Sequence, residues 1–146
     1  MRRTITFVSV IVSSLWLIAA MPAQAQTILT WTNQYQSVLA VNQYNQATGA
    51  LIGTYTNNAP NSCDMGQPQA MTGWLATGST GLAITFTVNF LGCNSAAVWT
   101  GQLAGNGNFQ GLWLLSLAAP VVWNGVSAGA DSFTLQSGDI AKLARH

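Results

Sequence analysis

Charged side chains are what this sequence has least of. They make up 5% of the 146 residues, with four Lys and Arg residues, one His and no Glu, whereas a typical soluble domain has about 25%. A nucleic-acid-binding face needs many cations to neutralise phosphates, so that class of function is excluded. The length fits one domain. An aromatic content of 10% with six Trp also excludes a disordered chain.

The few titratable residues are badly spaced for catalysis. The one histidine is His146, at the end of the sequence, so no Ser–His–Asp or Cys–His arrangement can be assembled. Asp64, Asp131 and Asp139 fall in a predicted loop, at a strand start and in the C-terminal tail, which does not suit a glycosidase pair. Too few ligands remain for a metal site if the cysteines are bridged. We therefore predict no enzyme, no catalytic residue, no metal and no cofactor.

The N-terminal segment has the pattern of a secretory signal peptide. Arg2 and Arg3 precede an apolar stretch over 5–20, and small residues end the segment at 22–25. This pattern predicts cleavage after Ala25 and a mature, secreted or periplasmic domain over 26–146. A membrane anchor is the alternative, but it would need about 20 purely apolar residues. No second hydrophobic span follows, so we expect no membrane association after processing.

Cysteine is also scarce: the chain has only Cys63 and Cys93. An even number of cysteines in an exported protein favours a disulfide. Closing a loop of about 30 residues would stabilise the fold by roughly 3–4 kcal/mol in the chain-entropy treatment. Two buried free thiols are the alternative.

Helical periodicity is hard to find after residue 25. Gly, Asn, Thr and Ser turns instead separate eight strand-like segments, at 28–33, 37–44, 50–57, 70–77, 81–90, 95–104, 109–117 and 129–136. In 81–90 the apolar side chains of Leu82, Ile84, Phe86, Val88 and Phe90 alternate with smaller or polar ones, as in a strand with one buried face. Eight strands with short links predict an all-β fold, an antiparallel up-and-down β-barrel. A two-sheet sandwich is the rival.

One segment, 109–117, is apolar on both faces. If Trp113, Leu115 and Leu117 point inward, Leu112 and Leu114 point outward, beside the outward Val98 of the preceding strand. An uncovered apolar patch of this kind usually marks a protein interface. We therefore expect a homo-oligomer, although a loop or tail folded over the patch is the alternative.

Polar residues on the inward faces share one end of the barrel. In an up-and-down barrel the ends of odd strands and the starts of even strands lie at the same rim. That rim collects Asn33, Ser37, Tyr55, Asn57, Ser95 and Asp131. The loops 57–69, 91–94 and 118–128 belong to it too, which brings Cys63 within reach of Cys93 and adds Trp123.

An apolar cavity with a few convergent polar groups is how small-molecule sites are built. We expect its walls to come from Trp31, Phe90, Trp99 and Trp113. A buried carboxylate at Asp131 costs free energy unless it has a hydrogen-bond partner. Because no Lys or Arg lies in the barrel region, we expect that partner to be a neutral N–H group of the protein or of a ligand. The predicted ligand is compact and partly apolar, with an uncharged head group that both accepts and donates hydrogen bonds. The alternative is that these polar residues only cap turns and that the Trp side chains only fill the core.

Seven short motifs, in order and at matching spacing, resemble the avidin/streptavidin family of biotin-binding barrels, over about 29–136. They are WTNQ (31–34), TGALIGTY (48–55), MTG (71–73), FTVNF (86–90), VWTGQ (98–102), WLL (113–115) and DSFT (131–134). The resemblance implies a streptavidin-like eight-stranded barrel that holds one small ligand. It also implies high-affinity, non-covalent binding of biotin, which is a ligand here and not a cofactor.

The resemblance also implies a role for each position. Asn33, Ser37 and Tyr55 match the donors to the ureido oxygen of biotin. Asp131 and Asn57 match the acceptors of its two N–H groups. Ser95 matches a hydroxyl near the valerate carboxylate of biotin. The aromatic box is matched by Phe90, Trp99 and Trp113, with Leu115 beside it. Trp123 matches a tryptophan that comes from a neighbouring subunit. The last match favours a tetramer or a larger assembly. Some bacterial members have a disulfide between the loops that carry Cys63 and Cys93.

Two positions depart from the better-known members of the family. Phe90 stands where they have Trp, and Ala97 stands where a Thr faces the thioether sulfur of biotin. The missing hydrogen bond should cost roughly 1 kcal/mol of binding free energy. A lipocalin-like carrier of another hydrophobic ligand is the runner-up, but a lipid carrier has no use for such a polar rim.

Overall fold

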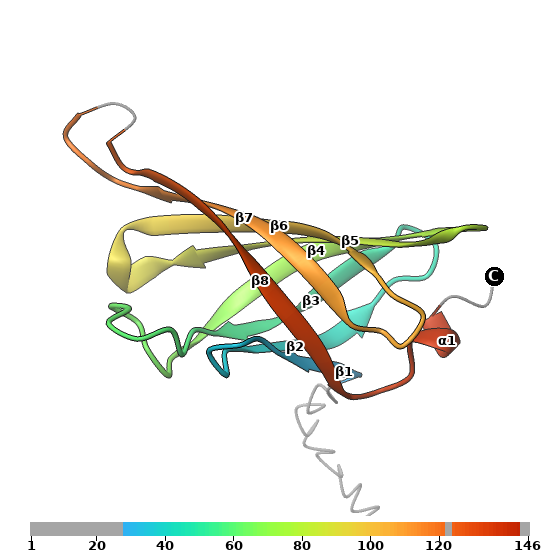
Figure 1. Ribbon diagram of the computed structural model, residues 1–146. Coiled ribbons are helices and arrows are strands. Elements are labelled where there is room, and N and C mark those ends of the chain that lie inside the picture. Colours follow the sequence, from blue (N-terminus) through green and yellow to red (C-terminus); the bar gives the residue numbers. More distant parts are fainter. Residues whose placement is uncertain (1–27, 122–123, 144–146) are drawn as a thin grey trace, which may run out of the picture.

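The computed structural model describes residues 28–121 and 124–143, and these form a closed eight-stranded barrel (Figure 1). The predicted signal peptide and Trp123 lie outside the described residues. The strands are β1 (Leu29–Thr32), β2 (Val38–Tyr44), β3 (Ala50–Thr56), β4 (Pro68–Gly78), β5 (Gly81–Phe90), β6 (Ser95–Leu103), β7 (Phe109–Leu117) and β8 (Val126–Ser137). A 3₁₀ turn η1 (Leu91–Cys93) links β5 to β6, and a short helix α1 (Ile140–Leu143) follows β8.

Every strand pairs antiparallel with the next, and β8 closes the ring on β1. The predicted up-and-down barrel is therefore confirmed, and the sandwich is not what the chain forms. The largest boundary differences are at β4 and β8, which begin at Pro68 and Val126 instead of 70 and 129. These extensions are exposed or half-buried, but paired to the neighbouring strand. Apolar alternation reports a buried face, so it does not detect paired residues at an exposed strand end.

The inward side chains form one continuous core. Trp31 packs edge-on against Phe109 at 5.8 Å between ring centroids, and Phe109 stacks on Phe133 at 4.5 Å. The Trp31 indole N–H donates to the carbonyl of Gly107, in the turn between β6 and β7, at 2.8 Å. Burying a large apolar side chain contributes about 1.5–3 kcal/mol. This aromatic cluster therefore closes the end of the barrel that carries the β6–β7 turn.

The opposite end, which we call the open rim, consists of turn 33–37, loop 57–67, η1 and the β7–β8 connection, at the left of Figure 1. A disulfide joins Cys63 of the loop to Cys93 of η1, with 5.9 Å between the Cα atoms. The predicted disulfide is thus present, and both described cysteines belong to it. It ties together two connections that flank the mouth.

In the described part of the chain, no helix has the length and apolar character needed to cross a bilayer.

Candidate functional site

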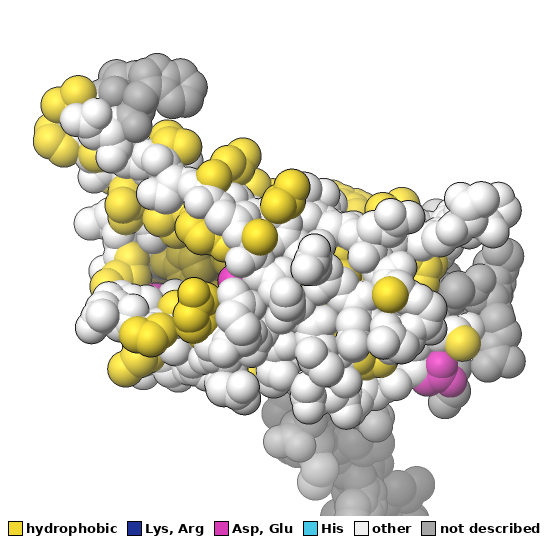
Figure 2. Space-filling model, in the orientation of Figure 1, with side chains coloured by type: hydrophobic (Ala, Val, Ile, Leu, Met, Phe, Trp, Pro, Cys, Tyr) yellow, Lys and Arg dark blue, Asp and Glu magenta, His cyan; other side chains and the backbone are white. Residues whose placement is uncertain are grey.

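A cavity of about 190 Å³ opens at the open rim. Figure 2 shows it as a hollow walled by hydrophobic side chains, with an acidic side chain visible inside. Nine residues singled out from the sequence line it, joined by Tyr35 and Ala59: Asn33, Tyr55, Asn57, Phe90, Ala97, Trp99, Trp113, Leu115 and Asp131. Ser37 and Ser95 do not line the cavity, but both are buried.

The barrel register explains why these side chains meet. Phe86, Trp99 and Trp113 lie opposite one another on β5, β6 and β7, and the next inward row holds Val88, Ala97 and Leu115. Asp131 on β8 lies opposite Gly111, which is one inward position from Trp113 on the side away from Leu115. Adjacent strands therefore bring the aromatic and polar walls of the cavity together from neighbouring rows.

Trp99 is the centre of the aromatic wall. Its ring stacks on Phe86 at 4.8 Å with an interplanar angle of 5°, and lies 4.9 Å from Tyr55. Phe90 meets it edge-on at 6.5 Å. Aromatic pairs in such arrangements add about 0.5–1.5 kcal/mol beyond their buried area. The wall is therefore a rigid, apolar surface against which a flat ring can pack.

Trp113 completes the wall because the residue opposite it, on β8, is Gly129. A Cβ atom at Gly129 would lie 2.4 Å from Cζ2 of Trp113. The absence of a side chain thus lets the indole lie across β8. Sequence periodicity gives no signal for this role.

We expect Gly129→Ala to displace the Trp113 indole. Overpacking of this kind costs about 1–3 kcal/mol, so any ligand that packs on the indole should bind roughly tenfold more weakly. Gly105→Ala is the control, since a Cβ there meets nothing within 4 Å. Tryptophan emission and ligand titration of both variants check this. Equal affinities would show that the indole position does not matter.

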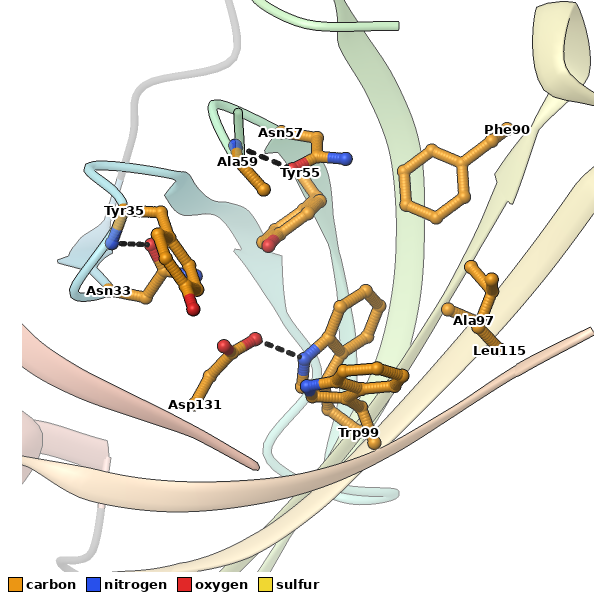
Figure 3. A pocket seen from close by; sticks show the side chains of 11 residues that line it. Asn33, Tyr35, Tyr55, Asn57, Ala59, Phe90, Ala97, Trp99, Leu115 and Asp131 are labelled. Carbon is orange, nitrogen blue, oxygen red and sulfur yellow. Dashed lines mark hydrogen bonds between the residues drawn. The ribbon is translucent and has the colours of Figure 1, made fainter. Parts of the chain in front are cut away.

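The carboxylate of Asp131 is buried and held by neutral donors (Figure 3). Its Oδ2 accepts from the Trp99 indole N–H at 2.9 Å, and its Oδ1 accepts from the Gln34 amide at 2.8 Å. Gln34 is itself oriented, because its Oε1 accepts from the backbone N–H of Ser132 at 2.9 Å. The described side chains include no Lys, Arg or His. Among the described residues, the partners of Asp131 are therefore neutral donors and not cations.

Asn33 is fixed in the opposite sense, as a donor. Its Oδ1 accepts from the backbone N–H groups of Tyr35 at 3.0 Å and Ser37 at 2.9 Å. This local turn is why Asn is used directly after β1, since its side chain replaces a missing backbone acceptor. With the oxygen occupied twice, the side chain offers its Nδ2 hydrogens to the cavity.

Tyr55 and Ser37 form a second pair of hydroxyls beside Asn33. Ser37 hydrogen-bonds the Tyr55 phenol and accepts from the backbone N–H of Asn58 at 2.9 Å. Burial raises the pKa of Tyr55 well above its ordinary value; the Ser37 bond opposes this, and the charges of Asp131 and Asp64 add to it. The phenol therefore stays neutral and keeps its proton to donate.

This pKa shift has a consequence for stability at high pH. Below about pH 10 the phenol is protonated in both the folded and the unfolded chain. Above that pH the unfolded chain loses the proton first, so the free energy of unfolding should fall as the pH rises further. Tyr55→Phe should lose less stability between pH 10 and 11 than the wild type. Chemical denaturation at pH 8, 10 and 11 measures this, and identical slopes would contradict it.

Several side chains lie elsewhere than the sequence predicted, or contribute to the site without a sequence signal. Trp31 does not line the cavity, because its height on β1 places it in the aromatic cluster at the far end. Tyr35, half exposed in the turn 33–37, does line it. A signal for Tyr35 was available, since it lies between Asn33 and Ser37 in the sequence. Gln34 and Asp64 gave no periodic signal, because both lie in loops.

The chain is similar in sequence and in fold to known proteins. The sequence model of the Avidin family matches residues 21–136. The solved structure of bradavidin is 65% identical, with a TM-score of 0.76 over 81% of this chain and 87% of that one. Core-bradavidin is 66% identical, with a TM-score of 0.72 over 74% and 98%. A rhizavidin–biotin complex is 25% identical, with a TM-score of 0.63 over 78% and 95%. No curated protein sequence matches the chain.

Proposed function

The chain belongs to the avidin family of non-enzymatic biotin-binding proteins, and we propose that the cavity at the open rim holds the ureido head of biotin. The observation that carries this proposal is the fixed polarity of the groups around one spot. Asn33 is oriented as a donor and the Tyr55 phenol keeps its proton, whereas Asp131 and Asn57 carry oriented acceptor oxygens. A cyclic urea needs this set, because its carbonyl accepts and its two N–H groups donate.

The bicyclic ring of biotin would pack between Trp99, Trp113 and Phe90, with Leu115 beside it. Such a preorganised, mostly apolar pocket removes the ring from water without reorganisation of the protein. Ala97 offers no hydroxyl to the thioether sulfur, so the sulfur would be held by van der Waals contact alone. Ser95, buried at the start of β6, is the hydroxyl that we assign to the valerate carboxylate. Biotin is bound as a ligand, and the proposal needs no cofactor.

Isothermal titration of the mature chain, 26–146, with biotin tests this assignment. We expect saturation at one biotin per chain and a change in tryptophan emission, because Trp99 and Trp113 line the cavity. A folded sample that gives neither heat nor a spectral change would refute the assignment.

The assembly is part of the proposal. Val98, Leu112, Leu114 and Val126 form an exposed apolar face on β6, β7 and β8 that we call the outer apolar face. Leu114 lies opposite Val98 on one side and Ala128 on the other, so the face is continuous. An exposed apolar face of this kind usually marks a protein interface, which supports the proposal of a homo-oligomer. We propose a tetramer or larger, in which Trp123 reaches a neighbour's cavity.

Leu114→Asp should break the assembly, since it places a charge in the centre of the outer apolar face. Light scattering should show a smaller particle than for the wild type at the same concentration. Thr72→Asp, on the exposed face of β4, is the matched control and should keep the wild-type size. A wild-type mass for Leu114→Asp would rule out this face as the interface.

We also propose that residues 1–25 direct export to the periplasm or the medium and are then removed. N-terminal sequencing of the exported protein should begin at Gln26. An intact N-terminus on cell-associated protein would argue for an anchor instead.

A further inference from the structure

Asp64 is a buried carboxylate in loop 57–67 that does not line the cavity. Its side chain is 7% exposed, although the described loop around it is largely exposed and carries no cation. One oxygen, Oδ2, is buried without a hydrogen-bond partner among the described residues. Burial of an incompletely paired carboxylate costs free energy. A carboxylate at this buried position therefore has a role other than packing.

The other oxygen of Asp64 contacts the site. Its Oδ1 accepts from Nδ2 of Asn57 at 3.2 Å. The Oδ1 of Asn57 accepts from the backbone N–H of Ala59 at 3.0 Å, as Figure 3 shows. A carboxylate can only accept and a backbone N–H can only donate, so the two contacts together fix which way the Asn57 amide points.

This orientation decides what Asn57 offers to a ligand. A carbonyl oxygen has two acceptor positions, and Ala59 uses one of them. The other is left for a donor in the cavity, which Asn57 lines. A rotated amide would present hydrogens instead and would face a ligand N–H with a second donor. The polarity of this part of the cavity thus depends on what holds Nδ2.

Asp64 is itself held in place by the loop. It follows Cys63, which is bonded to Cys93 in η1, and its backbone carbonyl accepts from Gln67 N–H at 3.0 Å. The Gly66 N–H donates to the carbonyl of Asn57 at 2.8 Å, which closes the loop on itself. The disulfide and these bonds therefore bring the carboxylate to Asn57.

We propose that Asp64 is a positioning residue that locks the Asn57 amide with its oxygen as the acceptor for one ureido N–H of biotin. This inference rests on the proposed function of the cavity. It adds a residue that acts through Asn57 and never touches the ligand. It also explains why the loop keeps a carboxylate in a buried position.

A double-mutant cycle tests the proposal. Asp64→Ala should weaken biotin binding roughly tenfold, the size of one lost hydrogen bond, chiefly by faster release. Asn57→Ala should have a similar effect. The double variant should be no weaker than Asn57→Ala alone, because Asp64 acts through that side chain. Asp64→Asn, which can still present an oxygen to Asn57, should recover part of the affinity.

Ser62→Ala is the matched control, because the Ser62 hydroxyl is buried in the same loop and has no hydrogen-bond partner in the part of the chain that the structure describes. It should bind like the wild type. A role in loop folding alone would instead make the Asp64 and Asn57 effects multiply in the double variant. Multiplied effects, or wild-type affinity for Asp64→Ala, would overturn the proposal. If Asp64→Ala does not fold, the same cycle with Asp64→Asn decides.

A ligand-free measurement separates this inference from the biotin assignment. In ¹⁵N spectra of the free protein, the Asn57 side-chain NH₂ should exchange with solvent faster in Asp64→Ala than in the wild type or Ser62→Ala. That result would stand even if the wild type failed to bind biotin. Unchanged exchange would refute the lock whatever the affinity for biotin.

Discussion

Replacing Asp131 with Ala is expected to weaken biotin binding by about 100-fold. A hydrogen bond from a ligand N–H to a charged acceptor contributes about 1.5–3 kcal/mol, and each 1.4 kcal/mol is a factor of ten in affinity. The variant loses that bond. It also leaves the indole N–H of Trp99 and the amide of Gln34 without the acceptor that now orients them. The cavity would then present two competing donors where the ligand also donates.

Titration calorimetry and the biotin release rate measure this effect, with thermal unfolding as the check on folding. Asp139→Ala is the matched control, because that carboxylate lies away from the cavity, where it accepts from the backbone N–H of Ala141 in the C-terminal helix. It should bind biotin like the wild type. Asp131→Asn should lie between the two, since it keeps one acceptor oxygen but adds donors. A loss below threefold for Asp131→Ala would remove Asp131 from the ligand contacts.

Removing the disulfide is expected to destabilise the protein by about 3–4 kcal/mol, the second large effect. The bridge closes a loop with a sequence separation of 30 between Cys63 and Cys93, and the chain-entropy treatment gives this size for such a loop. The Cys63→Ser/Cys93→Ser double variant removes the bridge and leaves no single reactive thiol. Denaturant unfolding measures the difference in the free energy of unfolding. Both samples need the same protein concentration, because the stability of an assembled protein depends on concentration.

The same variant should bind biotin more weakly. The bridge connects loop 57–67, which carries Asn57 and Asp64, to η1, which follows Phe90 directly. Wild-type protein treated with a dithiol reductant is the parallel sample and should behave like the double variant. A double variant as stable as the untreated wild type would mean that strand pairing alone fixes these connections.

The strands and their faces were predictable because a strand with one buried face has an apolar side chain at every second residue. Leu82, Ile84 and Phe86 alternate with polar or small neighbours, and that pattern needs no tertiary information. The order of ends and starts along the chain then assigns Asn33, Tyr55 and Asp131 to one rim. The sequence therefore predicted whether a side chain lies inside or outside the barrel. It also predicted the end of the barrel at which the residue lies.

The height of a side chain along the barrel and the contacts of loop residues were not readable. Trp31 has the right face for the cavity but belongs to the far cluster with Phe109, because the stagger between strands sets its height. Asp64 lies in a loop, where no repeat links sequence position to direction. Only the folded chain brings it beside Asn57.

The sequence by itself thus determined an all-β barrel with an apolar interior, one polar rim and a disulfide between two rim loops. Each of these follows from local chemistry: alternation of period two, turn-forming residues, and paired cysteines in a chain with a predicted export signal. Only the tertiary structure decided how Tyr55 and Asn57 are oriented. A side-chain amide or hydroxyl can donate or accept, and the partner that removes this freedom lies elsewhere in the sequence: Ser37 for Tyr55 and Asp64 for Asn57.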